Sequence, residues 1–407
     1  MKKSKILGGI LLVSGTAIGA GMLALPISTA SNGFFPSALT FLVCWMFMTV
    51  AALLVVEVNL HLPGEKDFIS MVSLTLGLPG KIIAWVGYLL LLYALISAYL
   101  MGGSSWLLKL LSDFNITWPL ILALSIMVVI FGTITSYGTA LTDHINRYFV
   151  FGLVIAYFIL IVVAFPSIEI EKIKISNFDN ISKTLPLVTT AFGFSVILPS
   201  LTNYLERDIR VLRLVVIVGG LIPLLIYLLW QLVTLGIIPL TGQHSFQQLA
   251  ETHDNGTGVA FALEHLVQNA WITQSSRWFA IFAMLTSLLG ISLALFHFLA
   301  DGLKVNPKKT SMRLLLLLLT FIPPVLVVLF YPSGFSRILS FAGLFVSVLL
   351  GILPVIMVWR MRYANITIAK KAVEYRVWGG KCLLIVVLCF FTYISYLEIA
   401  NCLLCRS

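Results

Sequence analysis

The stretch that decides the fold is Gly15-Thr16-Ala17-Ile18-Gly19-Ala20-Gly21-Met22-Leu23-Ala24-Leu25-Pro26, inside the first long apolar run. Its glycines and its proline stand where a bilayer-spanning helix would have its middle. Glycine in a helix interior costs ~1 kcal/mol relative to alanine, and proline costs ~3 kcal/mol. Unpaired backbone groups are not tolerated against lipid. A helix break here must be buried in protein or line a wet cavity, although Gly15-x-x-x-Gly19 also fits close helix packing.

The sixth apolar run carries a similar interruption, Thr189-Thr190-Ala191-Phe192-Gly193-Phe194-Ser195-Val196-Ile197-Leu198-Pro199-Ser200. It too places a glycine, a hydroxyl and a proline at mid-span. The two interrupted runs lie five spans apart, and a repeat with an odd number of spans inverts its second copy in the bilayer. Interrupted helices at matching positions of inverted repeats are the best sequence indicator of a transporter's midplane site. The two interruptions together therefore favour broken helices over close packing.

The composition predicts a membrane-embedded helical chain. Of 407 residues, 60% are hydrophobic and 10% are charged, with a mean hydropathy of +1.04. A soluble domain has ~45–50% apolar and ~25% charged residues. The composition excludes a soluble enzyme, a secreted disulfide scaffold and a disordered chain, and long apolar runs exclude an outer-membrane barrel. We expect an all-α polytopic membrane protein in which residues 1–407 form one transmembrane domain. Because a span needs ~20 apolar residues, the expected eleven spans cover residues 6–30, 34–57, 82–108, 118–138, 147–166, 185–204, 211–237, 278–300, 313–331, 337–359 and 381–403.

Basic residues in the connections set the expected orientation. With the N-terminus in the cytoplasm, 19 of the 26 Lys and Arg residues fall on the cytoplasmic side and 7 fall outside. We therefore expect a cytoplasmic N-terminus and, after eleven spans, an external C-terminus. The net charge of +10 reflects this topology, so we expect a lipid bilayer and no nucleic acid as a partner. The external connection 238–277 contains an apolar stretch, 259–266, which is either a surface helix over a vestibule or an ordinary loop.

The two interruptions, together with Glu57-Val58-Asn59-Leu60-His61 after the second run, resemble the bacterial aromatic amino-acid permeases. These are the tryptophan- and tyrosine-specific group of the amino acid/polyamine/organocation superfamily. The resemblance covers essentially the whole chain and is strongest to the tyrosine-specific group. It implies a leucine-transporter-type fold, with inverted five-helix repeats at about 6–166 and 185–359 and an extra helix at about 381–403. It also implies uptake of an aromatic amino acid, tyrosine above all, across the bacterial inner membrane. The resemblance further implies that a cation gradient drives this uptake, and the cation described for this family is the proton.

An amino acid brings a carboxylate, an ammonium group and a side chain to its site. The break at Gly19–Met22 would free backbone N–H groups at the positive end of a half-helix, which suits the carboxylate. The break at Phe192–Ser195 would free carbonyls, which suit the ammonium group. Small residues are needed at both places because only they let a substrate reach the backbone. The expected substrate-binding residues are Gly19, Ala20, Gly21, Met22, Phe192, Gly193, Phe194, Ser195 and Tyr93.

The pocket for the substrate side chain should be apolar and aromatic. Phe192 and Phe194 flank the second break, and Tyr93 and Tyr99 lie mid-way along the third run. Each of these four rings could instead face lipid or pack between helices.

A sodium-type coupling site has one candidate set of ligands. The eighth run contains Ala283-Met284-Leu285-Thr286-Ser287, and two adjacent hydroxyls with freed carbonyls can coordinate a cation. In sodium-coupled relatives of the implied fold, the corresponding positions build a sodium site with carbonyls of the first span, here those of Gly15 and Ile18. The alternative is that Thr286 and Ser287 bond back to their own helix.

A proton-coupled transporter instead needs a titratable carrier in or near a span. The candidates are Glu57, Asp301 and His297. The two carboxylates could instead pair with Lys304 or Arg147, and His297 could simply bond to a neighbouring helix. The resemblance over the whole chain favours the proton over sodium as the coupling cation.

Other functional classes lack their sequence signatures. A membrane-embedded enzyme would need clustered His, Asp or Glu, whereas the six histidines are scattered. There is no phosphate-binding loop for a primary pump and no charge ring or repeated filter for a channel. Cys402-x-x-Cys405 has no second pair or histidine nearby. We expect no enzyme activity, no cofactor and no bound metal, and a permease for another small zwitterion or an exchanger remains the alternative.

Overall fold

A computed structural model describes residues 3–62, 64, 66–252, 257–306, 309–332, 334–364 and 375–404. Over these residues the chain is helical apart from its connections and one isolated β-bridge between Gly33 and Ser176. In this part of the chain nine helices are long and apolar enough to cross a membrane, and ten if one bent pair counts as a single span. That pair is α1 (Lys3–Ala17) and α2 (Gly21–Thr29). The expected fourth span is α5 (Leu120–Ser136), a shorter apolar helix of 17 residues.

The other helices follow the expected apolar runs. The spanning ones are α3 (Phe34–His61), α4 (Phe68–Asp113), α6 (Thr139–Ala164), α8 (Ile181–Ala191) with α9 (Leu198–Tyr204), α10 (Ile209–Ile237), α13 (Ala270–Gly302), α14 (Thr310–Phe330), α15 (Phe335–Val346) with α16 (Leu353–Tyr363), and α17 (Gly380–Leu404). The short connecting helices are α7 (Ile170–Ile173), α11 (Phe246–Thr252) and α12 (Gly258–Val267). The stretch 259–266 is therefore helical, within α12, and is not an ordinary loop. Cys405 lies outside the described residues.

α4 starts earlier than the sequence predicts. It begins at Phe68, where the Asp67 carboxylate accepts the Ser70 N–H at 3.0 Å and caps the first turn. Gly77, with φ +74°, then bends the backbone before the apolar span. The apolar pattern revealed only the span, because the added segment before Gly77 is mixed in character.

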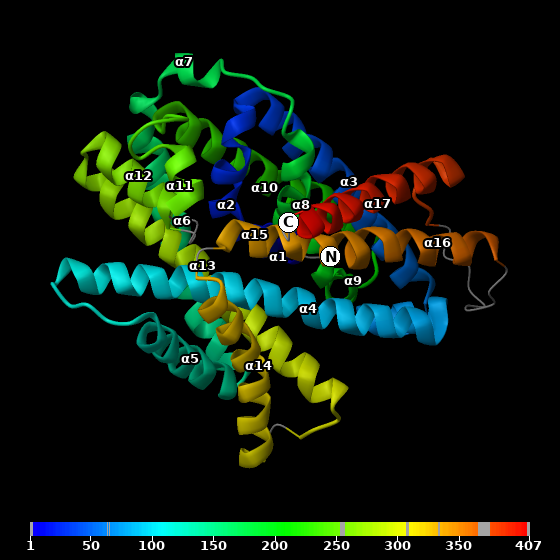
Figure 1. The fold of residues 1–407 in the computed structure, drawn as a ribbon. Helices are drawn as coiled ribbons and strands as arrows, with labels where there is room; N and C mark the ends of the chain where they lie inside the picture. The colour runs from blue at the N-terminus through cyan, green and yellow to red at the C-terminus, as the bar shows by residue number, and fades with distance from the viewer. Residues whose placement is uncertain are drawn as a thin grey trace.

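α4 forms a long rod through the bundle, with α5 and α14 on one side and α15 on the other (Figure 1). α15 packs in turn on α8, and α8 packs on α2 and α3. This layering buries both interrupted spans inside the protein. Ala20 and Met22 of the first interruption and Phe192 and Phe194 of the second are all 0% exposed. The broken backbone is therefore kept away from lipid, as the sequence argument requires.

Candidate substrate site

The first span breaks between Ala17 and Gly21, as predicted, and its two halves meet at 51°. The Ala20 N–H donates to the Ser287 hydroxyl of α13 at 3.0 Å. Among the described residues, no protein group accepts a hydrogen bond from the N–H of Gly19 or of Gly21. The start of α2 therefore presents two free donors at the positive end of a helix.

The sixth span breaks directly after Ala191, also as predicted. Phe192 and Gly193 separate α8 from the 3-10 turn η3 (Phe194–Ile197), which leads into α9. The N–H groups of Phe192 and Gly193 turn back to the carbonyls of Thr189 and Thr190, each at 3.1 Å. The Ala191 carbonyl is left for a partner outside its own helix.

Tyr227 of α10 brings the two breaks together. Its hydroxyl lies 2.6 Å from the Ala17 carbonyl oxygen and 2.9 Å from the Ala191 carbonyl oxygen. These carbonyls belong to the last residues of α1 and α8. A tyrosine hydroxyl has one proton, so it donates to only one of them at a time. Two helix C-termini, each with partial negative charge, thus converge at one buried point.

The two breaks present partial charges of opposite sign. The free N–H groups at the start of α2 attract an anion. The carbonyl ends of α1 and α8, which meet at Tyr227, attract a cation. The free N–H groups belong to Gly19 and Gly21, and the two carbonyls belong to Ala17 and Ala191. A bound carboxylate and ammonium group therefore need no charged side chain here.

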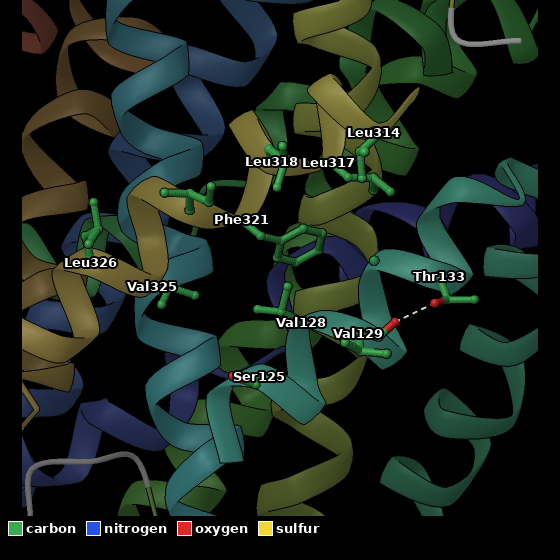
Figure 2. Close-up of a pocket in the computed structure, with 12 residues that line it drawn as sticks. Ser125, Val128, Val129, Thr133, Leu314, Leu317, Leu318, Phe321, Val325 and Leu326 are labelled. Carbon is green, nitrogen blue, oxygen red and sulfur yellow. Dashed lines mark hydrogen bonds between the residues drawn. The ribbon is translucent and has the colours of Figure 1, made fainter. Parts of the chain in front are cut away.

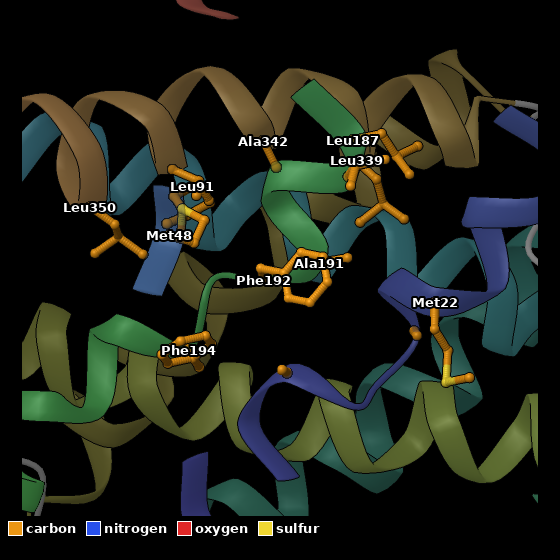
Figure 3. Close-up of a cluster of buried hydrophobic side chains, with 14 of the residues drawn as sticks. Met22, Met48, Leu91, Leu187, Ala191, Phe192, Phe194, Leu339, Ala342 and Leu350 are labelled. Atoms are coloured by element: carbon orange, nitrogen blue, oxygen red, sulfur yellow. The ribbon is translucent and has the colours of Figure 1, made fainter. Parts of the chain in front are cut away.

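Aromatic rings surround this point. The Phe192 ring lies 5.1 Å from the Tyr227 ring, centre to centre. The Trp230 indole N–H donates to the Met22 carbonyl at 3.1 Å, and its ring lies 5.0 Å from that of Phe279. Figure 3 shows Phe192 beside Ala191 and the α15 side chains, with Phe194 apart from it across the break. These rings form a buried aromatic cluster beside the two breaks.

Not every expected contact residue lies at the breaks. The Tyr93 hydroxyl donates to the Leu319 carbonyl of α14 at 2.9 Å, so its hydroxyl serves helix packing. The other tyrosine of that span, Tyr99, is buried in the core of the bundle. The Ser195 hydroxyl is buried and has no hydrogen-bond partner among the described residues.

Phe194 has a packing role against α10. It lies so close to Gly220 that a Cβ there would come within 3.1 Å of its ring. Gly220 therefore lets this ring sit directly on the α10 backbone.

The structure joins only part of the expected cation set. Ser287 reaches the first break, but its oxygen accepts the Ala20 N–H. The Thr286 hydroxyl donates to the Ala283 carbonyl of its own helix at 3.1 Å, which is the packing alternative. In the described part of the chain, the Gly15 and Ile18 carbonyls accept no hydrogen bond.

Glu57 is held in a buried ion pair near the C-terminal end of α3. Its carboxylate accepts from the Arg362 guanidinium at 2.7 and 2.5 Å and from the Val377 N–H at 2.7 Å. Both side chains are nearly inaccessible, at 2% and 6% exposed. The prediction that Glu57 pairs with Lys304 or Arg147 is wrong. Its partner is Arg362, which lies far along the sequence and is brought to Glu57 by the packing of α16 on α3.

Sequence reasoning missed the contribution of α10. Its polar residues Tyr227, Trp230, Gln231 and Thr234 are all buried. They recur at helical spacing within an otherwise apolar span, so they form one stripe facing the breaks. That stripe was visible in the sequence and is the signal that could have found Tyr227.

A cavity of about 450 Å³ lies elsewhere, between α5 and α14 (Figure 2). Its lining is mostly apolar, and Figure 2 shows the Phe321 ring of α14 beside Val128 of α5. Val129 is 66% exposed, so this groove opens onto the apolar outer face of the bundle. It lacks groups for a carboxylate or an ammonium ion and is separate from the breaks.

Known proteins align with this chain over nearly its whole length. The tryptophan/tyrosine permease family pattern matches residues 2–398. The "Tyrosine-specific transport system 1" of Haemophilus influenzae is 35% identical over 399 residues, which cover 98% of this chain and 97% of that protein. The "Tyrosine-specific transport system 2" of the same organism is 33% identical, covering 95% and 94%. A "Tryptophan-specific transport protein" of that organism is 29% identical, covering 96% and 94%. With its apolar helices and its paired helix breaks, the chain belongs to the tryptophan/tyrosine permease family of membrane transport proteins, which are permeases and not enzymes.

Proposed function

We propose that this permease imports tyrosine across the bacterial inner membrane and holds it at the two helix breaks. The observation that carries the proposal is the convergence at Tyr227. There, carbonyl ends of α1 and α8 meet beside the free N–H groups of α2. Such an arrangement recognises an ammonium and a carboxylate on the same small molecule.

The substrate pose follows from these groups. The carboxylate accepts from the N–H groups of Gly19 and Gly21, and the ammonium group donates to the Ala17 and Ala191 carbonyls. Phe192 and its aromatic neighbours contact the side chain. The tyrosine-specific relatives at 35% and 33% identity support tyrosine, and the tryptophan-specific relative at 29% makes tryptophan the second candidate.

Uptake into proteoliposomes tests this function. Labelled tyrosine should accumulate, and unlabelled tyrosine should compete more strongly than tryptophan, phenylalanine or non-aromatic amino acids. Gly21→Leu should abolish uptake. A Cβ at Gly21 would already lie 3.8 Å from the Ala191 Cα of α8, so the rest of the leucine side chain would fill the space between the two breaks.

Gly290→Leu is the matched control, since a Cβ at this spanning glycine meets nothing within 4 Å. Both variants should insert and purify as single species. Normal tyrosine uptake by Gly21→Leu would place the carboxylate site elsewhere.

We propose the proton as the coupling cation. The Ser287 oxygen faces the Ala20 N–H, and a positive N–H dipole disfavours a cation at the same oxygen. The Thr286 hydroxyl donates its hydrogen bond to the Ala283 carbonyl of its own helix. Family resemblance points the same way. Because Glu57 is committed to Arg362, His297 and Asp301 of α13 are the carriers that remain among the three candidates.

A pH gradient should therefore drive uptake in the absence of sodium. Vesicles with an acidic exterior should accumulate tyrosine, and a protonophore should abolish the accumulation. If uptake requires sodium, and Thr286→Ala with Ser287→Ala removes that requirement, the coupling proposal is wrong while the substrate proposal stands.

We also propose eleven spans, with α5 as the fourth, in two inverted repeats over residues 6–166 and 185–359 and an extra helix over 381–403. The support is the occurrence of breaks in the first and sixth spans and the 19-to-7 distribution of basic residues. The N-terminus is then cytoplasmic and the C-terminus external. Reporter fusions at the two ends of the chain should report opposite compartments, and a shared compartment would contradict this topology.

A further inference from the structure

A second cavity, of about 230 Å³, lies on the side of the bundle away from the start of α1. We call it the Glu398 cavity. It is formed where α2, α8, α15 and α17 meet. Its polar lining includes Ser28, Lys183, Arg337, Ser340, Glu398 and Asn401. At ~30 Å³ per water molecule, the cavity has the room of about eight waters, which suits a ligand smaller than a drug molecule.

Glu398 is an under-satisfied buried carboxylate. It is 3% exposed, and the Ser340 hydroxyl donates to its Oε2 at 2.9 Å. In the part of the chain that the structure describes, no Lys or Arg nitrogen lies within ion-pair distance of it. A carboxylate offers about four acceptor positions, and a buried charge is costly unless it is paired. The cavity beside Glu398 is therefore a place for a positively charged donor.

Two cations line the same cavity at exposed positions. Lys183 lies in the first turn of α8 and Arg337 in the first turn of α15, and both side chains are exposed. Neither forms an ion pair with a described carboxylate. The cavity thus has a buried negative group inside and free positive groups toward solvent, separated by enough space to prevent direct pairing.

The cavity lies on the same helices as the breaks. Ser28 is about 10 Å beyond Gly21 along α2, and the lining residue Leu187 is about 6 Å before Ala191 along α8, at a rise of ~1.5 Å per residue. Two of the helices that line the cavity, α2 and α8, thus also carry the breaks.

We propose that the Glu398 cavity is a second binding site for an amino-acid zwitterion. Glu398 and Ser340 hold the ammonium group, and Arg337 and Lys183 hold the carboxylate. This proposal rests on the proposed transport of tyrosine, and it adds a site that the substrate occupies before the breaks. A ligand with one charge would satisfy only one end of the cavity, so the site selects zwitterions.

Equilibrium binding of labelled tyrosine to the purified protein in lipid nanodiscs tests the proposal. The wild-type chain should bind two tyrosines, and Glu398→Gln and Gly21→Leu should each bind one. The double variant should bind none. Arg337→Gln, at an exposed position that the fold does not need, should weaken the second site by about ten- to a hundred-fold, as loss of a charged hydrogen-bond partner does. Glu171→Gln, which removes an exposed acid paired with Lys174, is the matched control and should bind two.

Single-charge analogues identify the chemistry of the cavity. Tyramine lacks the carboxylate and 4-hydroxyphenylpropionate lacks the ammonium group, so neither should displace tyrosine from the site that remains in Gly21→Leu. Displacement by tyramine alone would make the cavity a cation site and overturn the proposal. Two tyrosines bound to Glu398→Gln would also overturn it. A wild-type chain that transports tyrosine but binds only one would refute the second site alone, whereas a chain that neither binds nor transports amino acids would refute the proposed function as well.

Discussion

Gly19→Ala tests how tightly the first break is held by α13. A Cβ at Gly19 would lie 2.3 Å from the Ser287 hydroxyl oxygen, a separation that real Cβ atoms do not show. The hydroxyl must rotate away and give up the Ala20 N–H, which it now accepts at 3.0 Å. Leaving that buried N–H without a partner costs about 1–3 kcal/mol. Replacing glycine by alanine returns ~0.4–1 kcal/mol through the unfolded chain, so the expected net loss is about 1–2 kcal/mol.

A double-mutant cycle separates this contact from general damage. Ser287→Ala removes the same hydrogen bond and should cost about as much as Gly19→Ala. The double variant has neither the clash nor the bond, so it should be no less stable than Ser287→Ala alone. The two changes are therefore expected to be non-additive by about 1–2 kcal/mol.

Gly21→Ala is the control, because a Cβ at Gly21 has its nearest neighbour at 3.8 Å. It should leave the stability unchanged or slightly raised. The measurement is the free energy of unfolding of each purified variant in mixed micelles, together with the KM for tyrosine uptake, which should rise for Gly19→Ala. Additive losses in the double variant would refute the reasoning, since they would mean that Gly19 and Ser287 act through different contacts.

The remaining predictions concern three other groups. Tyr227→Phe should lower the free energy of unfolding by about 1–3 kcal/mol, because it removes the one hydroxyl proton that the two buried break carbonyls share; thermal unfolding in detergent checks this, and an unchanged midpoint would argue against the bridging role. Glu57→Gln should destabilise the protein by about 3–5 kcal/mol, because Arg362 stays buried without its countercharge; vesicles that contain the surviving protein should still show proton-driven uptake, and loss of that dependence would restore Glu57 as the carrier. Burial raises the pKa of Glu264 in α12, but the hydrogen bonds from Arg277 and the positive charges of Lys109 and Arg277 together outweigh burial and hold the pKa below its ordinary value of 4.5. The stability that this pair contributes is therefore present above that value and is lost as the pH falls through the lowered pKa; unfolding followed between about pH 3 and pH 6 should show a loss that Glu264→Gln lacks.

The sequence by itself predicted the membrane class and both helix breaks. The reason is that hydropathy and the cost of glycine and proline in a helix are local properties. They act over one turn or one span, whatever the neighbouring helices do. The breaks after Ala17 and Ala191 were therefore readable from single segments, and so was α12 as one of two alternatives.

Tertiary structure alone decided which groups meet. Tyr227 lies 210 residues from Ala17 along the chain, yet its hydroxyl joins Ala17 to Ala191. Glu57 pairs with Arg362, which is 305 residues away, rather than with either of the cations that sequence reasoning named. Tyr93 and Tyr99 share one helix and looked equivalent, but the Tyr93 hydroxyl donates to a carbonyl of α14 whereas Tyr99 is buried in the core. Hydropathy does not distinguish the faces of a helix that is apolar all round, because lipid and protein neighbours accept the same side chains. The packing of the helices determines which face of each helix is turned toward the protein interior, and therefore which residues surround the breaks and the Glu398 cavity.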